Sequence, residues 1–337
     1  MPGGLKVVPN KTLKVGWLPF YNLLPIRNEL EQAFGANLEF EQGSPTYINQ
    51  LLAAGKLDLG LCSSVSLVKN PNTKIAIPAG LSAKKSTKSI YLGFHHEHLE
   101  FLSEIKSRIE DLAPVFEESQ KRQRTEPRAA AQRILENNFI APYRKLQGFR
   151  VLIPSSTATG ASFVRMLFPL LFGERIAETT QPSQAMAFDG AARPIELLVG
   201  DEALIRRPQF VAVLDIGEVW HSLTSLPFVI SVWQTNATEL SEVFTRKIQR
   251  CAERAQAKMQ IDPASFEPDQ EFKDLNGKPI CLRSCWKNMD YVLGPKEMDG
   301  LLLFLNLIRE MNQRHLAPEV LVKLSRMSHW HAHQPSL

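Results

Sequence analysis

The sequence contains little of what marks secreted, metal-binding or membrane-spanning proteins. Its 337 residues include four cysteines, too few for a disulfide framework in a chain of this length. Cys281 and Cys285 are four residues apart, but no second pair completes a zinc site. No apolar run approaches the ~20 residues that span a bilayer, and the opening "MPGGLKVVPNKTLKV" lacks the apolar core of a signal peptide. We therefore expect a soluble cytoplasmic protein with reduced thiols and no membrane partner.

Concentrated charge is scarce as well. The net charge is +4 and 22% of the residues are charged, without the dense basic face that a nucleic-acid partner requires. The hydrophobic content of 44% is ordinary for a globular protein. The length predicts two domains, or two lobes of one unit.

The histidines do not form a metal-binding motif. "HHEH" at 95–98 lacks the helical spacing and third ligand of a zinc enzyme. His329, His331 and His333 alternate near the C-terminus, which we interpret as a frayed tail. We expect no metal and no cofactor.

Strand and helix patterns alternate along most of the chain, which predicts an α/β fold with a largely parallel sheet. A polar loop divides a strand from a helix within 149–173, and a strand at 195–204 runs into a tight turn. The remaining segment, 235–326, is expected to be mostly helical, with an apolar run at 299–308. The other expected elements are strands at 13–18, 58–64, 74–82, 89–94 and 227–234, a strand within 211–223 with Asp215 placed to cap the following helix, and a helix at 47–57.

Residues 95–148 interrupt this alternation. Their apolar residues recur every three or four positions, which predicts one apolar helix face, with Pro114 as a point of interruption. We interpret the segment as a helical excursion on the surface; a lid or an oligomer contact is the alternative. The residues of this face are Leu102, Ile105, Ile109, Leu112 and Phe116.

Small polar residues follow four of the expected strands. Ligands of open α/β sheets bind outside the carboxyl ends of the strands, so these turns predict a shared cleft. Hydroxyls, Gly160 and the amides of a following helix suit an anion at 155–162, although plain helix capping explains a single turn equally well. We interpret Asp201 and Asp215 as helix caps rather than an acid/base pair. The four turns contain Asn22, Ser63 with Ser64, Ser155 to Ser162, and Gly200 with Asp201.

The order and content of several blocks resemble the chorismate dehydratases of menaquinone biosynthesis by the futalosine route. These enzymes are similar to periplasmic binding proteins kept in the cytoplasm. The blocks cover most of the chain apart from the leader and residues 95–148. They are "VGWLPFYNLLP", "GSPTYINQLLAAGKLDLGLCSSVSLVKNP", "KSIYLGF", "GFRVLIPSSTATGASFVRMLF", "LLVGDEAL", "VLDIGEVWHSLTSLPFVISVW" and "MDYVLGPKEMDGLLLFLNLI".

The resemblance implies a two-lobed fold of the type II periplasmic-binding-protein kind, each lobe a mostly parallel sheet flanked by helices. Lobe one would comprise residues 13–83 and 234–326. Lobe two would comprise residues 84–233, with the helical insertion at 95–148, and residues 327–337 would form a tail.

The resemblance also implies a reaction and a set of residues. The family removes water from chorismate to give 3-[(1-carboxyvinyl)oxy]benzoate, and aromatisation drives the step without a metal, redox cofactor or covalent nucleophile. Asn22 corresponds to the family's asparagine nearest the chemistry. Ser63, Ser64, Ser89 and Thr159, with Gly160 and Ser162 in the same turn, would bind the small anionic substrate. The alternatives are a non-catalytic binding protein for a carboxylic acid and a sister enzyme, a naphthoate synthase, which would require a histidine in the cleft.

The chain departs from the family pattern close to these residues. Pro19 and Leu23 stand where the family has serine and threonine, and Gly160 stands where it has serine. The loop before Ser89 carries Lys84, Lys85 and Lys88, which would either attract a dianion or form a solvated hinge loop. A divergent relative that binds another aromatic acid is the alternative that these departures raise.

Overall fold

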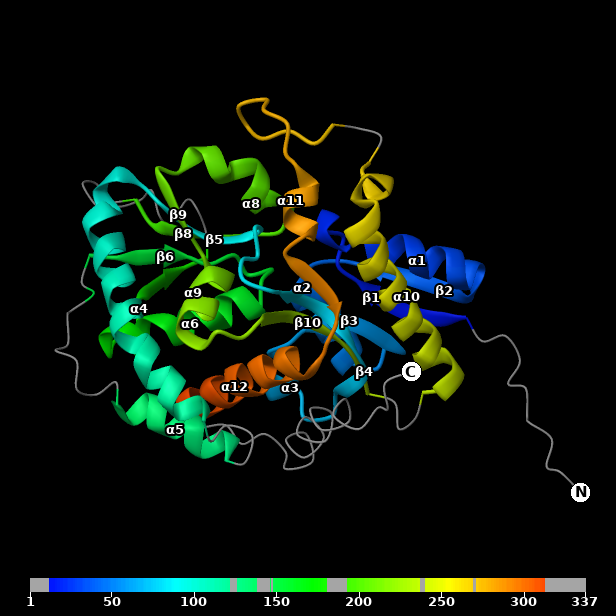
Figure 1. The fold of residues 1–337 in the computed structure, drawn as a ribbon, viewed down its shortest axis with the longest axis horizontal. Helices are drawn as coiled ribbons and strands as arrows, with labels where there is room; N and C mark the ends of the chain where they lie inside the picture. The colour runs from blue at the N-terminus through cyan, green and yellow to red at the C-terminus, as the bar shows by residue number, and fades with distance from the viewer. Residues whose placement is uncertain are drawn as a thin grey trace, which may run out of the picture.

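The computed structural model describes residues 12–121, 126–137, 146, 148–180, 193–236, 240–268 and 271–312. Two groups of strands, each flanked by helices, lie side by side in Figure 1 and form two lobes. The expected tail at 327–337 and its three histidines lie outside the described residues.

The sheet of lobe one has six strands in the order β11-β4-β10-β3-β1-β2. β1 pairs in parallel with β2 and β3, whereas β10 runs antiparallel to both β3 and β4. The long strands β4 and β10 carry the chain into lobe two and back again. The strands are β1 (Leu13–Trp17), β2 (Leu38–Gln42), β3 (Leu59–Ser63), β4 (Lys74–Ala83), β10 (Phe228–Thr235) and β11 (Met289–Val292).

The sheet of lobe two has five strands in the order β7-β6-β8-β5-β9. β6 pairs in parallel with β7 and β8, and β5 runs antiparallel to β8 and β9. Both sheets are therefore mixed rather than mostly parallel, because β10 and β5, which flank the crossings, run against their neighbours. The strands are β5 (Ile90–Phe94), β6 (Arg150–Leu152), β7 (Ala177–Thr179), β8 (Ile195–Val199) and β9 (Ala212–Asp215).

Helices cover both sheets, and local signals explain where several of them begin. The Ser44 hydroxyl caps α2 by accepting a hydrogen bond from the Tyr47 amide, and Pro45 occupies its first turn. The α-helices are α1 (Leu24–Phe34), α2 (Pro45–Ala53), α3 (Ser66–Lys69), α4 (Leu99–Gln120), α5 (Pro127–Asn137), α6 (Thr159–Phe172), α8 (Asp201–Arg206), α9 (Ile216–Thr224), α10 (Glu242–Ile261), α11 (Leu282–Trp286) and α12 (Pro295–Asn312). The 3₁₀ turns are η1 (Tyr21–Leu23), η2 (Gly35–Asn37), η3 (His96–His98), η5 (Arg207–Gln209) and η6 (Pro263–Phe266).

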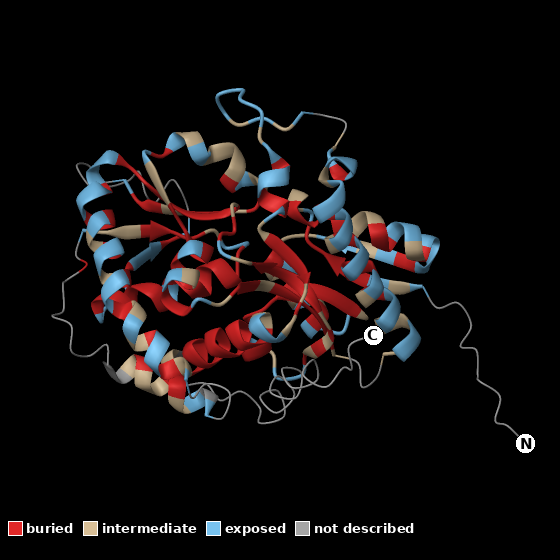
Figure 2. Ribbon diagram, viewed as in Figure 1, coloured by how far each residue is buried: buried red, intermediate tan, exposed pale blue. Residues whose placement is uncertain are grey.

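The buried residues form two main hydrophobic clusters, and α12 belongs to the cluster that contains the core of lobe two together with α3 and part of β10 (Figure 2). The apolar run of α12, Leu301 to Ile308, packs with α5 and α6. The sequence prediction assigns this segment to lobe one with the rest of 234–326, and α12 also contacts β10 and α3. The segment also contains a strand, β11, that the prediction of a mostly helical stretch missed.

The predicted helix face in 95–148 is confirmed, and it faces the core of lobe two. All five of its predicted apolar residues are buried in α4, which packs against α9, α5 and α6. The helix continues through Pro114 without ending there. Among the described residues, no helix has the length and apolar character needed to cross a membrane.

Candidate functional site

A small cavity lies between the lobes, and five of the seven predicted site residues line it: Asn22, Ser63, Ser89, Thr159 and Gly160. Its volume is about 30 Å³, roughly the space of one water molecule and far below the ~300 Å³ of a typical small-molecule site. The structure therefore shows the lobes closed, and a ligand larger than water requires them to separate.

Asn22 reaches the cavity from the turn η1, directly after β1. Its Nδ2 donates to the Ser89 hydroxyl at 3.4 Å, but its buried Oδ1 has no hydrogen-bond partner. The Tyr291 hydroxyl donates to the Asn22 carbonyl at 2.5 Å, and burial keeps the pKa of Tyr291 well above its usual range, so this donor stays protonated. A buried amide oxygen without a partner is costly, which marks Oδ1 as a place where a ligand donor is missing.

Ser89 lies at the end of the loop that joins the lobes, and Asp215 holds that loop. The Ser89 hydroxyl donates to the Thr87 carbonyl at 3.2 Å. The Asp215 carboxylate accepts from the amides of Thr87 at 2.9 Å and Lys88 at 2.8 Å, and from the Ser86 hydroxyl at 2.8 Å. Asp215 also caps α9 through the Gly217 amide at 2.8 Å, as the sequence predicts.

The N-terminus of α6 forms another wall of the cavity. Thr159 and Gly160 are its first residues, and no side chain caps it, so its first amides have no acceptor within the helix. The Thr159 hydroxyl donates to the Ile230 carbonyl at 2.8 Å and lies 3.4 Å from the Ser64 hydroxyl. Ser64 is fully buried behind Thr159 and does not line the cavity.

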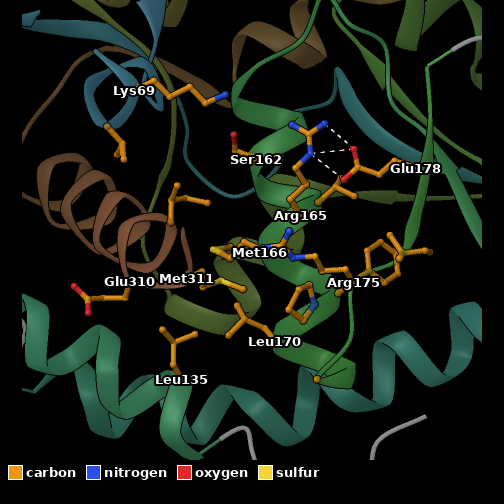
Figure 3. A pocket seen from close by; sticks show the side chains of 17 residues that line it. Lys69, Leu135, Ser162, Arg165, Met166, Leu170, Arg175, Glu178, Glu310 and Met311 are labelled. Carbon is orange, nitrogen blue, oxygen red and sulfur yellow. Dashed lines mark hydrogen bonds and ion pairs between the residues drawn. The ribbon is translucent and has the colours of Figure 1, made fainter. Parts of the chain in front are cut away.

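Ser162 lies away from the cleft, in contrast to the prediction that grouped it with Thr159. It lines a second cavity of about 630 Å³ between α3, α5, α6 and α12. Figure 3 shows it among the side chains that line this cavity, together with Arg165, whose guanidinium pairs with the Glu178 carboxylate at 2.7 Å. The axis of α6 carries Ser162 away from the lobe interface, and the two cavities share no lining residue.

Sequence reasoning missed Ser231, in the middle of β10. Its side chain is buried, lines the cleft cavity and has no hydrogen-bond partner for Oγ. The register of β10 on β3 places Ser231 opposite Ser63. The available signal was a hydroxyl within the apolar strand "PFVISVW", the same kind of anomaly that Asn22 presents in its own segment.

Asp201 does not cap its own helix, so that part of the prediction is wrong. Gly200 is the N-cap of α8, and no side chain caps it. The Asp201 Oδ1 instead accepts from the Tyr21 amide of the opposite lobe at 3.1 Å. Burial raises the pKa of this carboxyl to about 6, and the Tyr21 amide opposes that shift.

The described lining of the cleft cavity is neutral. It consists of apolar side chains, hydroxyls, the Asn22 amide and glycines, without a histidine or a charged side chain. Lys84 and Lys88, in the predicted lysine loop, instead lie near Asp290 at 3.3 Å and Glu218 at 3.7 Å. Among the described residues, no group of three or more histidine, cysteine or acidic side chains is placed to hold a metal ion. The arrangement suits binding of carboxylates by neutral donors and free amides.

The menaquinone-biosynthesis family profile matches residues 13–109 and 129–310. This chain belongs to that family. The match includes all seven predicted site residues and both crossings between the lobes, and it confirms the family relationship that the sequence blocks indicate.

The fold of this family member is that of periplasmic binding proteins. A Candida albicans gene product, described as having the generic periplasmic-binding-protein fold, shares 12% identity at a TM-score of 0.51 over 94% of this chain and 95% of its own. The ligand-binding component of an ABC-type import system from Staphylococcus aureus, solved with zinc bound, shares 13% identity at a TM-score of 0.51 over 93% and 99%. At 12% and 13% identity, the similarity to these two proteins concerns the fold alone.

Proposed function

We propose that this member of the menaquinone-biosynthesis family is a chorismate dehydratase that works in the cleft between the lobes without a cofactor. The observation that carries the proposal is the buried, unpartnered Asn22 Oδ1 in a closed cavity whose other polar groups are neutral donors. A carboxylate-bearing substrate suits such a lining, because hydroxyls and helix amides donate to carboxylates.

The dehydration requires positioning more than strong acid or base catalysis. A ring C–H bond and the neighbouring C–O bond break, the C–H electron pair becomes a ring double bond, and the proton and hydroxide leave as water. The Asn22 Oδ1 would accept from the departing hydroxyl group and fix its orientation. An amide is a poor base, and the described lining has no histidine or carboxylate, so the ring proton passes to a carboxylate of the substrate itself.

The remaining polar groups would hold the two carboxylates. The hydroxyls of Ser63, Ser89 and Ser231 and the first amides of α6 line the same cavity from both lobes. Closure would bring them together around the substrate and exclude water, which fixes the reacting groups in one geometry.

The test is turnover of chorismate by the purified protein, followed by ultraviolet absorbance of the aromatic product and by mass spectrometry for loss of one water. Asn22→Ala is expected to abolish turnover while leaving the circular dichroism spectrum unchanged. Ser162→Ala is a matched control, because Ser162 lies outside the cleft on the same helix as Thr159. Thermal stabilisation by chorismate without turnover would instead indicate a binding protein.

A further inference from the structure

Asp201 lies at the edge of the cleft, where lobe two contacts the turn that carries Asn22. Gly200 lines the cavity, and the next residue, Asp201, accepts from the Tyr21 amide at 3.1 Å across 180 positions of sequence. The turn η1 begins at Tyr21, and its own N-cap residue, Phe20, provides no side-chain acceptor. The carboxylate therefore caps this turn from the opposite lobe.

The contact around this cap is tight. Gly200 has a φ of 68°, and a Cβ atom there would lie 2.5 Å from the Phe20 ring, so glycine is required for the two lobes to approach this closely. Lobe one holds the carbonyl side of the same turn. The Trp286 Nε1 donates to the Tyr21 carbonyl at 3.0 Å, and the Tyr291 hydroxyl donates to the Asn22 carbonyl.

We infer that Asp201 is a positioning residue that orients Asn22 on lobe closure by capping the 21–23 turn from lobe two. The carbonyls of Tyr21 and Asn22 accept from side chains of lobe one itself, whereas the first amide of the turn has its acceptor in lobe two and gains it when the lobes meet. This inference rests on the proposed function for the role of Asn22, but the capping contact is independent of the ligand's identity.

Because of the contact between Asp201 and the Tyr21 amide, closure of the lobes depends on pH. Burial raises the pKa of Asp201 from an ordinary value of 3.8 to about 6 in the closed form. The closed form therefore binds a proton more tightly than a solvated carboxyl does. Closure becomes easier as pH falls from about 6 toward about 4, and above about 6 it includes the full cost of burying a charge.

Two neighbouring titratable groups bear on the pH dependence assigned to Asp201. On its own helix, Glu202 pairs with Arg206 at 2.8 Å. The Asp201 carboxylate accepts from the Tyr21 amide of η1, and it interacts electrostatically with the Cys285 thiol of α11, whose pKa burial raises to about 11. The pH dependence is thus assigned to the Asp201 carboxyl.

The first experiment compares amide hydrogen exchange of overlapping peptides covering residues 18–24 in the ligand-free wild type, Asp201→Ala, Asp201→Asn and Glu202→Gln. Asp201→Ala is expected to exchange about tenfold faster at Tyr21, the effect of losing one hydrogen bond to a charged group. Asp201→Asn keeps an acceptor and should stay within about threefold of the wild type. Glu202→Gln removes an exposed charge from the same helix and should change nothing. Equal exchange in wild type and Asp201→Ala, or equal loss of protection in folded Asp201→Asn, overturns the inference.

The second experiment measures kcat and KM for chorismate from pH 5 to 8. The wild-type KM is expected to rise as pH increases from 5 to about 6 and to level off above that, whereas the KM of Asp201→Asn stays flat and that of Glu202→Gln follows the wild type. A pH profile of Asp201→Asn that parallels the wild type overturns the inference. The exchange experiment requires no turnover, so failure of the wild type to convert chorismate refutes the proposed function and leaves the capping role to be judged separately.

Discussion

Replacing Asp215 is expected to unfold the loop between the lobes before it disturbs either core. Asp215 is 3% exposed, and its carboxylate accepts from side chains and amides of the 86–88 loop and from the α9 amides. Lys88 in this loop has a φ of 55°, a left-handed conformation that costs about 1 kcal/mol and needs surrounding bonds to hold it. The carboxylate thus holds the strained backbone at Lys88 and also provides acceptors for buried amides.

The magnitude follows from the donors that Asp215→Ala would leave behind. The buried amides of Thr87 and Gly217 lose their acceptor, at about 1–3 kcal/mol for the pair after partial relaxation, and α9 loses a cap worth about 1 kcal/mol. Strain of about 1 kcal/mol released at Lys88 offsets part of this, so the expected loss is about 1–3 kcal/mol. At about 2 °C per kcal/mol for a chain of this size, the melting temperature falls by about 2–6 °C.

Thermal melts of Asp215→Ala and Asp215→Asn by circular dichroism test this reasoning. Asp215→Asn keeps one acceptor oxygen and should lose about half as much stability. Asp111→Asn is the matched control for Asp215→Asn, because it makes the same chemical change on the exposed side of α4. A melting temperature for Asp215→Ala within about 1 °C of the wild type would refute the assignment of this carboxylate as the anchor of the loop.

Three further substitutions follow from contacts of single residues. Gly200→Ala is expected to hold the lobes apart, since its Cβ would meet the Phe20 ring at 2.5 Å, and small-angle scattering should show a larger radius of gyration. Gly160→Ser should be tolerated, because a Cβ there meets its nearest neighbours at 3.4 Å, and it should add about 0.5 kcal/mol of helix stability in a thermal melt. Glu29→Gln should lose roughly 1–2 kcal/mol at pH 7 by urea denaturation, because Glu29 is buried and accepts from the half-exposed Arg254 and Lys258 at 2.7 and 2.5 Å.

The ion pairs of Glu29 also predict that the free energy of unfolding depends on pH. Burial raises the pKa of this carboxyl, but the hydrogen bonds from Arg254 and Lys258 lower it by more, so its net pKa is below the ordinary value of 4.5. The stability that Glu29 contributes is therefore present above pH ~4.5 and lost as pH falls through its lowered pKa. Wild type and Glu29→Gln should converge in acid, and a gap that persists there would contradict the ion-pair explanation.

Each of the two glycine predictions is contradicted by one particular result. An unchanged radius of gyration for Gly200→Ala would show that the lobes accommodate the extra methyl without separating. A stability loss above about 1 kcal/mol for Gly160→Ser would show that the first turn of α6 is packed more tightly than its 3.4 Å contacts indicate.

The sequence predicts the elements and the residues of the turns well, but not the partners that meet across the lobes. Asp215 follows a strand and precedes a helix, so its capping role is readable locally, whereas its bond to the Lys88 amide joins residues 127 positions apart. Asp201 has the same local pattern, yet its acceptor oxygen meets Tyr21 instead of its own helix. Local patterns describe which groups lack partners, and only the closed arrangement of the lobes decides where those partners come from.

The spacing of residues in the sequence also does not show which cavity each side chain faces. Thr159 and Ser162 are three residues apart in one polar turn, but the axis of α6 points its first residues at the cleft and carries the later one to another cavity. Ser231 shows the converse. Alternation along β10 places its hydroxyl on one face, but the register with Ser63 is what brings that face to the cavity.

The neutrality of the cleft explains why residues outside it should matter as much as those that line it. A site without a charged side chain, a histidine or a nucleophilic thiol in its described lining depends on how well it orients a substrate whose aromatisation supplies the driving force. Misplacement by about 1 Å can cost about a hundredfold in rate when orientation is the main contribution. Asp215 fixes the loop that ends at Ser89, and Asp201 caps the turn that presents Asn22. If the dehydration proceeds by orientation, substitutions at these two carboxylates should reduce kcat although neither contacts the substrate.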